Sequence, residues 1–230
     1  MKFNIITIFP KIFDSYLNES ILKRAQKNKL INIKIHNLRD FTKDKHRKVD
    51  DRPFGGGPGM VLKIEPIVKA ISSILIIKNA KLIRQSTDKK KIKIILFTPT
   101  GKQFDNKMAA DFAKKNDNLI LICGRYEGID ERIKKVIYDL GFKIQEISIG
   151  PYVLTGGELP VMVLIDSISR QIPGVLGKQK SLEEKRYGIG LPVYTRPEVF
   201  EYKGKKYKAP KVLLSGDHKK IEKWQVKNRD

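Results

Sequence analysis

Hydrophobic residues recur along the chain at two different spacings. Short apolar runs have the length and composition of β-strands, and they lie at residues 2–9, 31–36, 91–97, 118–123 and 143–148. Segments whose apolar residues recur every three or four positions are predicted helices, at residues 20–28, 65–77, 106–115, 130–140, 157–170 and 218–228. Ser20 is expected to cap the first of these helices. The alternation of strands and helices predicts an α/β fold with a largely parallel sheet.

Three stretches of the chain have neither spacing. Residues 42–59 are polar and irregular, and loops of that length inside a compact domain are usually functional or disordered. Residues 79–90 are charged and predict a surface loop, while residues 172–197 are Gly-rich and predict a linker. The remaining residues are too few for an independent core, so we expect a small C-terminal subdomain.

The charge of the chain favours a polyanionic partner. Its 230 residues suit one large domain, or one main domain with a small appendage, and they include 47 basic and 25 acidic side chains, for a formal net charge of +22. A field of this size attracts nucleic acids. The alternative is a surface that is basic only because the chain is rich in lysine.

Several classes of protein lose support from the sequence. No apolar run reaches the roughly 20 residues that span a bilayer, and the N-terminus resembles a first strand rather than a signal peptide. The single cysteine, Cys123, fits a reducing cytoplasm. Because His36, His46 and His218 lie far apart and form no cluster with cysteine, no metal site is expected.

Turn-forming segments follow three of the predicted strands, at residues 98–101, 123–128 and 149–157. Ligands bind outside the carboxyl ends of strands in open α/β sheets, so these segments predict one small-molecule pocket, although each could also be an ordinary tight turn. The chain contains neither GxGxxG nor GxxxxGK[ST], which disfavours a dinucleotide or a P-loop phosphate ligand. Glu127 could attract a positive group on the ligand.

Basic, acidic and aromatic residues are mixed in the long segment HRKVDDRPFGGGPG, which begins at His46. Arginine and lysine can hold phosphates, and arginine or Phe54 can stack on an unstacked base. Asp50 could accept a hydrogen bond from a base edge. The alternative is a flexible hydrophilic loop, which Pro53 and Pro58 disfavour because proline stiffens the chain. This segment therefore predicts a nucleic-acid contact.

Six motifs stand in one order along the chain: HRKVDDRPFGGGPGM, CGRYEGIDER, SIGPYVLTGGELP, DSISRQIPGVLG, YTRPEVF and VLLSGDH. Together they closely resemble the bacterial tRNA (guanine-N1)-methyltransferase family of the SPOUT class. The resemblance runs from about Phe9 to Trp224, nearly the whole chain. It implies an α/β domain with a trefoil-knotted parallel sheet at residues 1–172, a linker at 173–196, and a small, mostly helical tRNA-binding domain at 197–230.

The resemblance also implies a reaction. The protein would be a cytoplasmic homodimer that methylates N1 of the guanosine immediately 3′ of the tRNA anticodon, with S-adenosylmethionine as methyl donor and magnesium often associated. Each active site would be built from both subunits. Carried over by motif, the cofactor contacts are Pro99, Gly124, Glu127, Ile149, Gly150, Pro151, Tyr152, Val153, Leu154 and Gly156. The tRNA contacts are Arg47, Asp50, Arg52, Phe54, Gly55 and Lys185.

Two catalytic groups are expected from the chemistry. Guanine N1 is a poor nucleophile until it loses its proton, so a carboxylate should act as general base. A guanidinium could stabilise the charge that builds on guanine O6, and the motif DSISRQIPGVLG makes Arg170 the candidate.

The expected base is where the chain departs from the family. The family usually has an aspartate in the linker after PGVLG, and this chain has Lys185 there. A protonated lysine cannot act as a base. In order of preference, Glu184 acts after a one-residue shift; or Lys185 or Arg186 binds RNA phosphate while water or another carboxylate takes the proton; or the protein binds both substrates and methylates poorly.

Two further departures leave other hypotheses open. Pro151 stands where the family commonly has an aspartate, and it removes one N–H donor from the cofactor loop. The chain ends soon after Trp224, where many members continue with further helix. Besides the methyltransferase, we consider a catalytically weak or inactive tRNA-binding protein on the same scaffold. A methyltransferase of this fold acting on ribosomal RNA or a 2′-hydroxyl is disfavoured by the HRKVDDRPFGGGPG and YTRPEV segments.

Overall fold

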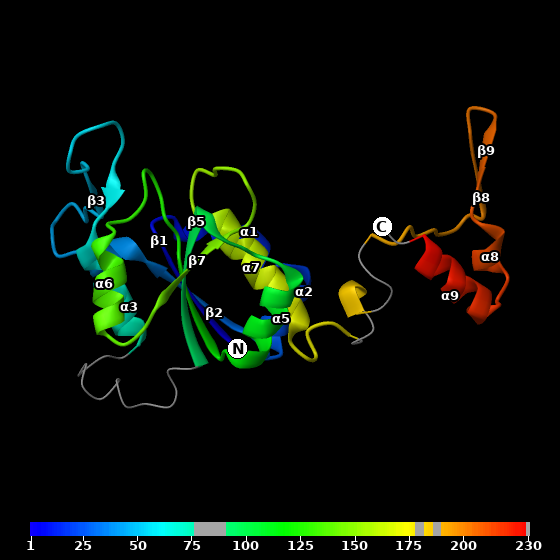
Figure 1. The fold of residues 1–230 in the computed structure, drawn as a ribbon, viewed down its shortest axis with the longest axis horizontal. Helices are drawn as coiled ribbons and strands as arrows, with labels where there is room; N and C mark the ends of the chain where they lie inside the picture. The colour runs from blue at the N-terminus through cyan, green and yellow to red at the C-terminus, as the bar shows by residue number, and fades with distance from the viewer. Residues whose placement is uncertain (76–90, 178–181, 186–189, 229–230) are drawn as a thin grey trace. The chain divides into compact units, whose positions relative to one another are not determined.

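The computed structural model describes residues 1–75, 91–177, 182–185 and 190–228. The chain divides into two compact units, Met1–Leu176 and Gly177–Asp230, and each is described by itself. In the first unit, one β-sheet lies between two layers of helices (Figure 1). The surface loop predicted at residues 79–90 lies outside the described residues.

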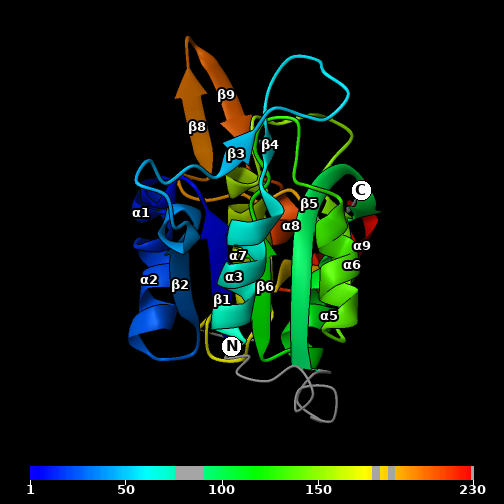
Figure 2. The same cartoon turned by 90° about the vertical axis from the view of Figure 1, so that its left-hand side faces the viewer.

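A five-stranded sheet forms the centre of the first unit. Its strands are β1 (Lys2–Thr7), β2 (Asn32–Asn37), β5 (Ile92–Gln103), β6 (Asn118–Ile122) and β7 (Ile144–Ser148). They lie in the order β2-β1-β6-β5-β7, and each neighbouring pair is parallel. Figure 2 shows the first four of these strands side by side. The predicted α/β fold with a parallel sheet is confirmed.

Helices cover both faces of this sheet. On one face lie α1 (Asp14–Leu17), α2 (Ser20–Lys27), α5 (Asn106–Lys115) and α7 (Glu158–Gln171), and on the other α3 (Ile64–Ile74) and α6 (Arg132–Asp139) (Figures 1 and 2). Two short 3₁₀ helices, η1 (Pro10–Phe13) and η2 (Leu38–Phe41), follow β1 and β2. Alternate residues of β6 enter different cores: Leu119 packs with the α7 side and Ile120 with the α3 and α6 side. The strand is therefore buried on both faces, as its continuous apolar run predicts.

The start of α2 differs from the prediction. Its N-cap is Glu19, which has an extended backbone (φ −122°, ψ 159°) and makes no side-chain capping hydrogen bond. Ser20 is already the first helical residue, so its predicted role as N-cap is wrong. Ser20 itself has a left-handed backbone, with φ 48°, whereas an N-cap residue is typically extended. Helix α5, by contrast, spans its predicted residues.

Strand β5 is longer than its apolar run. The predicted turn at residues 98–101 is wrong in part, because the strand continues to Gln103. Both Phe97 and Lys102 pair with Ile147 of β7, with an irregularity between them. A Cβ on Gly101 would lie 2.6 Å from the Ile147 backbone nitrogen. Gly101 therefore permits the backbone of β5 to lie close to that of β7. The spacing of apolar residues in the sequence does not indicate this contact.

Replacing Gly101 with alanine should destabilise the first unit by about 1–3 kcal/mol, because the added carbon forces β5 and β7 apart. Urea unfolding followed by circular dichroism measures the loss. The matched control is Gly177→Ala, where an added Cβ meets nothing within 4 Å, and its stability should change by less than about 0.5 kcal/mol. Equal stabilities of the two variants would show that the close approach does not matter.

The second unit contains a hairpin and helices. After η5 (Glu183–Lys185) come β8 (Val199–Tyr202) and β9 (Lys205–Lys208), which pair antiparallel, then α8 (Lys211–Leu214) and α9 (His218–Lys227). The predicted last helix is confirmed as α9, which Asp217 caps by accepting from the Lys220 amide at 3.1 Å. The hairpin was not predicted. Its turn places Lys203 and Gly204 at φ 49° and 74°, and a Lys-Gly turn is a weaker signal than Asn-Gly.

Candidate functional site

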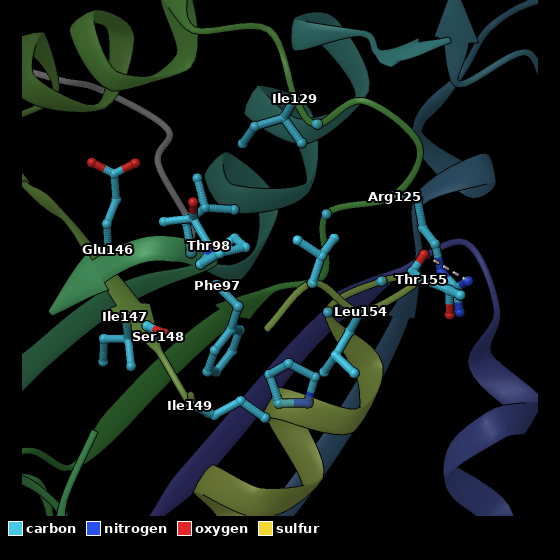
Figure 3. A pocket seen from close by; sticks show the side chains of 18 of the residues that line it. Phe97, Thr98, Arg125, Ile129, Glu146, Ile147, Ser148, Ile149, Leu154 and Thr155 are labelled. Carbon is cyan, nitrogen blue, oxygen red and sulfur yellow. Dashed lines mark hydrogen bonds between the residues drawn. The ribbon is translucent and has the colours of Figure 1, made fainter. Parts of the chain in front are cut away.

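A cavity of about 380 Å³ opens at the carboxyl ends of β6 and β7, beside the middle of β5. The three segments singled out from the sequence as candidate ligand loops meet around it. Figure 3 shows Ile149 and Leu154, from the segment after β7, around the same part of the cavity as Phe97 of β5. All of the predicted cofactor contacts except Pro151 line the cavity: Pro99, Gly124, Glu127, Ile149, Gly150, Tyr152, Val153, Leu154 and Gly156.

Glycines let the loops pack directly on one another. A Cβ on Gly157 would lie 2.7 Å from the Cα of Cys123, and the Gly157 amide donates to the Gly124 carbonyl at 2.9 Å. A Cβ on Gly156 would overlap the Arg125 side chain. At Gly124 an added Cβ would meet nothing within 4 Å. The loops after β6 and β7 therefore touch through backbone, while Gly124 leaves open space in the cavity wall.

A buried ion pair stands behind these loops. Arg125 Nη2 lies 2.9 Å from Oε2 of Glu158, whose side chain is only 2% exposed. Thr7 Oγ1 donates to Glu158 Oε1 at 2.8 Å, and Arg125 Nη1 donates to the Thr155 carbonyl at 3.1 Å. Figure 3 shows the second of these bonds. Neither Thr7 nor Glu158 stands out in the sequence, because one threonine in a strand and one acid at a helix start are common.

Two groups near the ion pair have shifted pKa values. Burial raises the pKa of the Cys123 thiol well above its ordinary value, and the nearby Glu158 carboxylate adds to the shift. The thiol is therefore neutral at pH 7 and no nucleophile. Partial burial, with a hydrogen bond to the Asp50 carboxylate, raises the pKa of Tyr126. Tyr126 also has a left-handed backbone, with φ 60°, which is uncommon for a bulky residue.

The long basic segment is attached to the cavity wall. Strand β3 (Asp50–Asp51) pairs with β4 (Val61–Leu62), and the Leu62 amide donates to the Gly128 carbonyl at 3.0 Å. The Glu127 amide donates to the Met60 carbonyl at 3.1 Å. A Cβ on Gly59 would overlap the Glu127 side chain, so this glycine permits the contact. The predicted RNA segment and the predicted cofactor loop are therefore neighbours.

Four of the five predicted tRNA contacts in this segment face solvent, while Asp50 is half-buried and accepts a hydrogen bond from Tyr126. The Phe54 side chain is 96% exposed, and a Cβ on Gly55 would meet nothing within 4 Å. Arg47 is exposed and lies 3.4 Å from Asp40. Arg52 is exposed as well, and its amide donates to Asp51 at 3.0 Å. The segment holds one exposed ring and two exposed guanidinium groups, which is the chemistry that contacts unpaired RNA.

The predicted catalytic residues lie away from the cavity or in the other unit. Arg170 is half-buried in the last turn of α7, and the cavity lies at the first turn of that helix. The separation of Arg170 from Glu158 along the helix is about 18 Å at 1.5 Å per residue. Glu184 belongs to η5 in the second unit, next to Lys185, whose side chain lies outside the described part of the structure, as does Arg186.

Neither a metal cluster nor a membrane span is found among residues that the structure describes. No group of three or more His, Cys, Asp and Glu side chains there could hold a metal ion. In the same residues, no helix is both long and apolar enough to cross a membrane.

Fold and cavity define a class of protein before any comparison. A parallel α/β sheet whose carboxyl-end loops enclose one cavity, with a basic segment fixed beside it, is the arrangement of a small-molecule-dependent protein that binds a polyanion. The family model described as tRNA (Guanine-1)-methyltransferase TrmD matches residues 1–230, so the chain belongs to that family.

Individual relatives agree with the family. A tRNA (guanine-N(1)-)-methyltransferase of Dictyoglomus turgidum is 48% identical over 230 residues, which cover 99% of this chain and 84% of the relative. An enzyme of the same name from Clostridioides difficile is 48% identical over 228 residues, covering 98% of this chain and 90% of the relative. The resemblance stated from the motifs is confirmed.

Proposed function

We propose that this chain is a tRNA (guanine-N1)-methyltransferase that transfers a methyl group from S-adenosylmethionine to N1 of the guanosine immediately 3′ of the anticodon. Family membership over the whole chain supports the enzyme class and the tRNA substrate. One observation carries the proposal. Nearly all of the cofactor contacts expected from the motifs lie around one cavity, and the basic segment is attached to the wall of that cavity.

The residues around the cavity fit the proposed methyl donor. They offer open space beside Gly124, apolar contacts from Phe97, Ile149 and Leu154, and the carboxylate of Glu127 for a positive group. A volume of about 380 Å³ lies within the range of small-molecule sites. When bound, S-adenosylmethionine supplies an electrophilic methyl group. Pro151 does not line the cavity, so its missing N–H need not weaken binding.

Proton removal and charge stabilisation fall to two side chains. We assign the general base to Glu184, which would accept the N1 proton of guanine. Arg170 would stabilise the negative charge that grows on O6. The alternatives, proton loss to water with Lys185 holding phosphate, or a protein that binds without methylating, are kept as outcomes of the test.

We further propose that the enzyme acts as a homodimer with active sites built from both subunits. Within one chain, Arg170 and the cavity lie at opposite ends of α7. A second copy of the chain is therefore needed to bring an Arg170 side chain to the cavity. Leu159 and Val163 are exposed, and their spacing places both on the same face of α7 as Arg170. An exposed apolar stripe on a core helix is typical of a subunit interface.

We propose a trefoil knot at residues 1–172, followed by a linker at 173–196 and a tRNA-binding domain at 197–230. We take the continued pairing of β5 with β7 as support for the knot, because it keeps the segment after Phe97 at the sheet as far as Gln103. The division into compact units after Leu176 supports the domain boundary. With tRNA as substrate, the enzyme would work in the cytoplasm. No step is assigned to magnesium, for which the described residues offer no ligand cluster.

The hairpin of the second unit is proposed as a tRNA contact. The ring centroid of Phe200 lies 6.4 Å from that of Tyr202, in a stacked arrangement, and 6.4 Å from that of Tyr207. All three side chains are about half exposed. Exposed lysines at positions 203, 205, 206 and 208 surround them. Aromatic rings among basic residues are the usual platform for unstacked bases.

Replacing Tyr207 with alanine should weaken tRNA binding about 5- to 100-fold, the range for loss of one base–aromatic stack. Filter binding at fixed salt measures the affinity. Tyr138→Ala removes an exposed tyrosine of α6 that lies in the first unit and should bind tRNA like the wild type. If both variants bind alike, the hairpin does not contact the tRNA.

The test of the proposed function is methyl transfer from labelled S-adenosylmethionine to an unmodified tRNA with G after the anticodon, beside the same tRNA with A there. The proposal expects label on the G transcript alone, at N1. No label, despite measurable binding of cofactor and tRNA, would make this a binding protein on an enzyme scaffold.

A further inference from the structure

Glu158 is a buried carboxylate with both oxygens engaged. Its Oε1 accepts from Thr7 Oγ1 at 2.8 Å, and its Oε2 accepts from Arg125 Nε at 2.9 Å. It is also the first residue of α7, where the free amides of the helix favour a negative charge. The negatively charged Glu158 carboxylate therefore connects Thr7, at the end of β1, to Arg125 in the loop after β6.

Arg125 extends this connection to the loop after β7. Its Nη1 donates to the Thr155 carbonyl at 3.1 Å (Figure 3). Its guanidinium carbon lies over the Phe9 ring, 4.7 Å from the ring centroid. The backbone of Arg125 also pairs with Gly156. The loops after β6 and β7 both line the cavity. Arg125 and its buried partner Glu158 therefore set the distance between these two loops.

We infer that Glu158, with Thr7 and Arg125, is a positioning residue that holds residues 124–127 and 154–157 at the spacing that admits the methyl donor. The inference rests on the proposed function and extends it to residues that the family motifs did not assign. Glu158 is too buried to touch a ligand, and Arg125, which lines the cavity, is held by the bonds of its Nε to Glu158 and its Nη1 to Thr155. Their effect on the reaction therefore passes through the shape of the loops.

Two variants interrupt the connection at different points. Glu158→Gln keeps the size of the side chain and removes the charge that fixes Arg125. Arg125→Lys keeps the charge, but one ammonium cannot replace the bonds of Nε to Glu158 and Nη1 to Thr155. Both should raise the Kd for S-adenosylmethionine and S-adenosylhomocysteine about tenfold or more in calorimetric titrations. Their KM for the donor should rise likewise, while kcat at saturation stays near the wild-type value.

Thr7 gives a test with little change in volume. Thr7→Val removes the hydroxyl that donates to Glu158 and accepts from the Phe9 amide, and it should weaken donor binding in the same direction. Thr7→Ser restores the hydroxyl and should restore donor affinity. If Thr7 only stabilised the fold, Thr7→Val and Thr7→Ser would both have a lower melting temperature, but their Kd values for the donor would not differ.

The matched control is Arg132→Lys. Arg132 lies 2.6 Å from Asp130 in an exposed ion pair outside the cavity wall, so its substitution should leave donor affinity unchanged. The inference is overturned if folded Arg125→Lys and Thr7→Val bind the donor like the wild type, whatever the fate of Glu158→Gln. A wild-type protein that binds no donor and methylates no tRNA would instead overturn the proposed function itself.

Discussion

Glu184→Gln should lower kcat for guanosine methylation by about 10²- to 10⁴-fold, the range that general-base catalysis contributes. An amide cannot take the N1 proton, while its size and polarity stay close to those of the carboxylate. KM for tRNA and for S-adenosylmethionine should therefore change little. Single-turnover methyl transfer with both substrates saturating measures the effect. The residual rate should increase toward alkaline pH, because guanine N1 then loses its proton to solvent.

The neighbouring Glu183 supplies the control for this variant. It also lies in η5, and its Oε1 accepts from the Gly190 amide at 3.2 Å, so its carboxylate is engaged within the second unit. Glu183→Gln should keep the wild-type kcat. Lys185→Ala should bind tRNA more weakly and keep kcat, as expected for a phosphate contact. If Glu184→Gln reacts at the wild-type rate, the proton leaves to water or to another carboxylate, and our assignment fails.

The position of the cavity could be predicted from the sequence. Parallel strands have their carboxyl ends at one edge of a sheet, so three Gly-containing segments after three apolar runs must be neighbours. The lengths of the apolar runs and the order of the elements are sufficient for this prediction. The resemblance to the family then predicts individual residues such as Glu127 and Leu154 as cofactor contacts, and both line the cavity.

Other features depend on contacts that periodicity does not encode. Strand β5 extends beyond its apolar residues because Gly101 allows it to lie against Ile147, which is an interaction between distant segments. Ser20 was expected to cap α2 from residue type alone, whereas Glu19 is the extended residue before the helix and Ser20 has a φ of 48°. In both places the tertiary structure overrides the local preferences of the residues.

The ion pair behind the cavity was missed for a related reason. Glu158 opens a helix, where an acid is favoured on any surface helix, so its type gives no sign of burial. Only the three-dimensional structure shows that Thr7, some 150 positions away along the chain, meets its carboxylate. A single sequence identifies which loops form the wall, but it does not show which side chains hold them in place.

Arg170→Gln should lower kcat by about 10²- to 10³-fold, comparable to the loss of one oxyanion-stabilising donor. Glutamine cannot provide the positive charge that guanine O6 needs as N1 is methylated, and Arg170→Lys should recover only part of the rate. Donor affinity should be unchanged, because Arg170 does not line the cavity. Arg24→Gln, at an exposed arginine of α2, is the control and should react like the wild type.

A mixing experiment decides whether Arg170 serves the cavity of its own chain or that of a second copy. Arg170→Gln is refolded together with Glu127→Gln, which is expected to bind the donor poorly. If Arg170 acts on the other subunit, each mixed dimer contains one site with an intact cavity and an intact arginine, and random mixing restores about a quarter of wild-type activity. If Arg170 acts within its own chain, no mixed dimer has a complete site and no activity returns. The second result would contradict the shared active site, although Arg170 could still be catalytic.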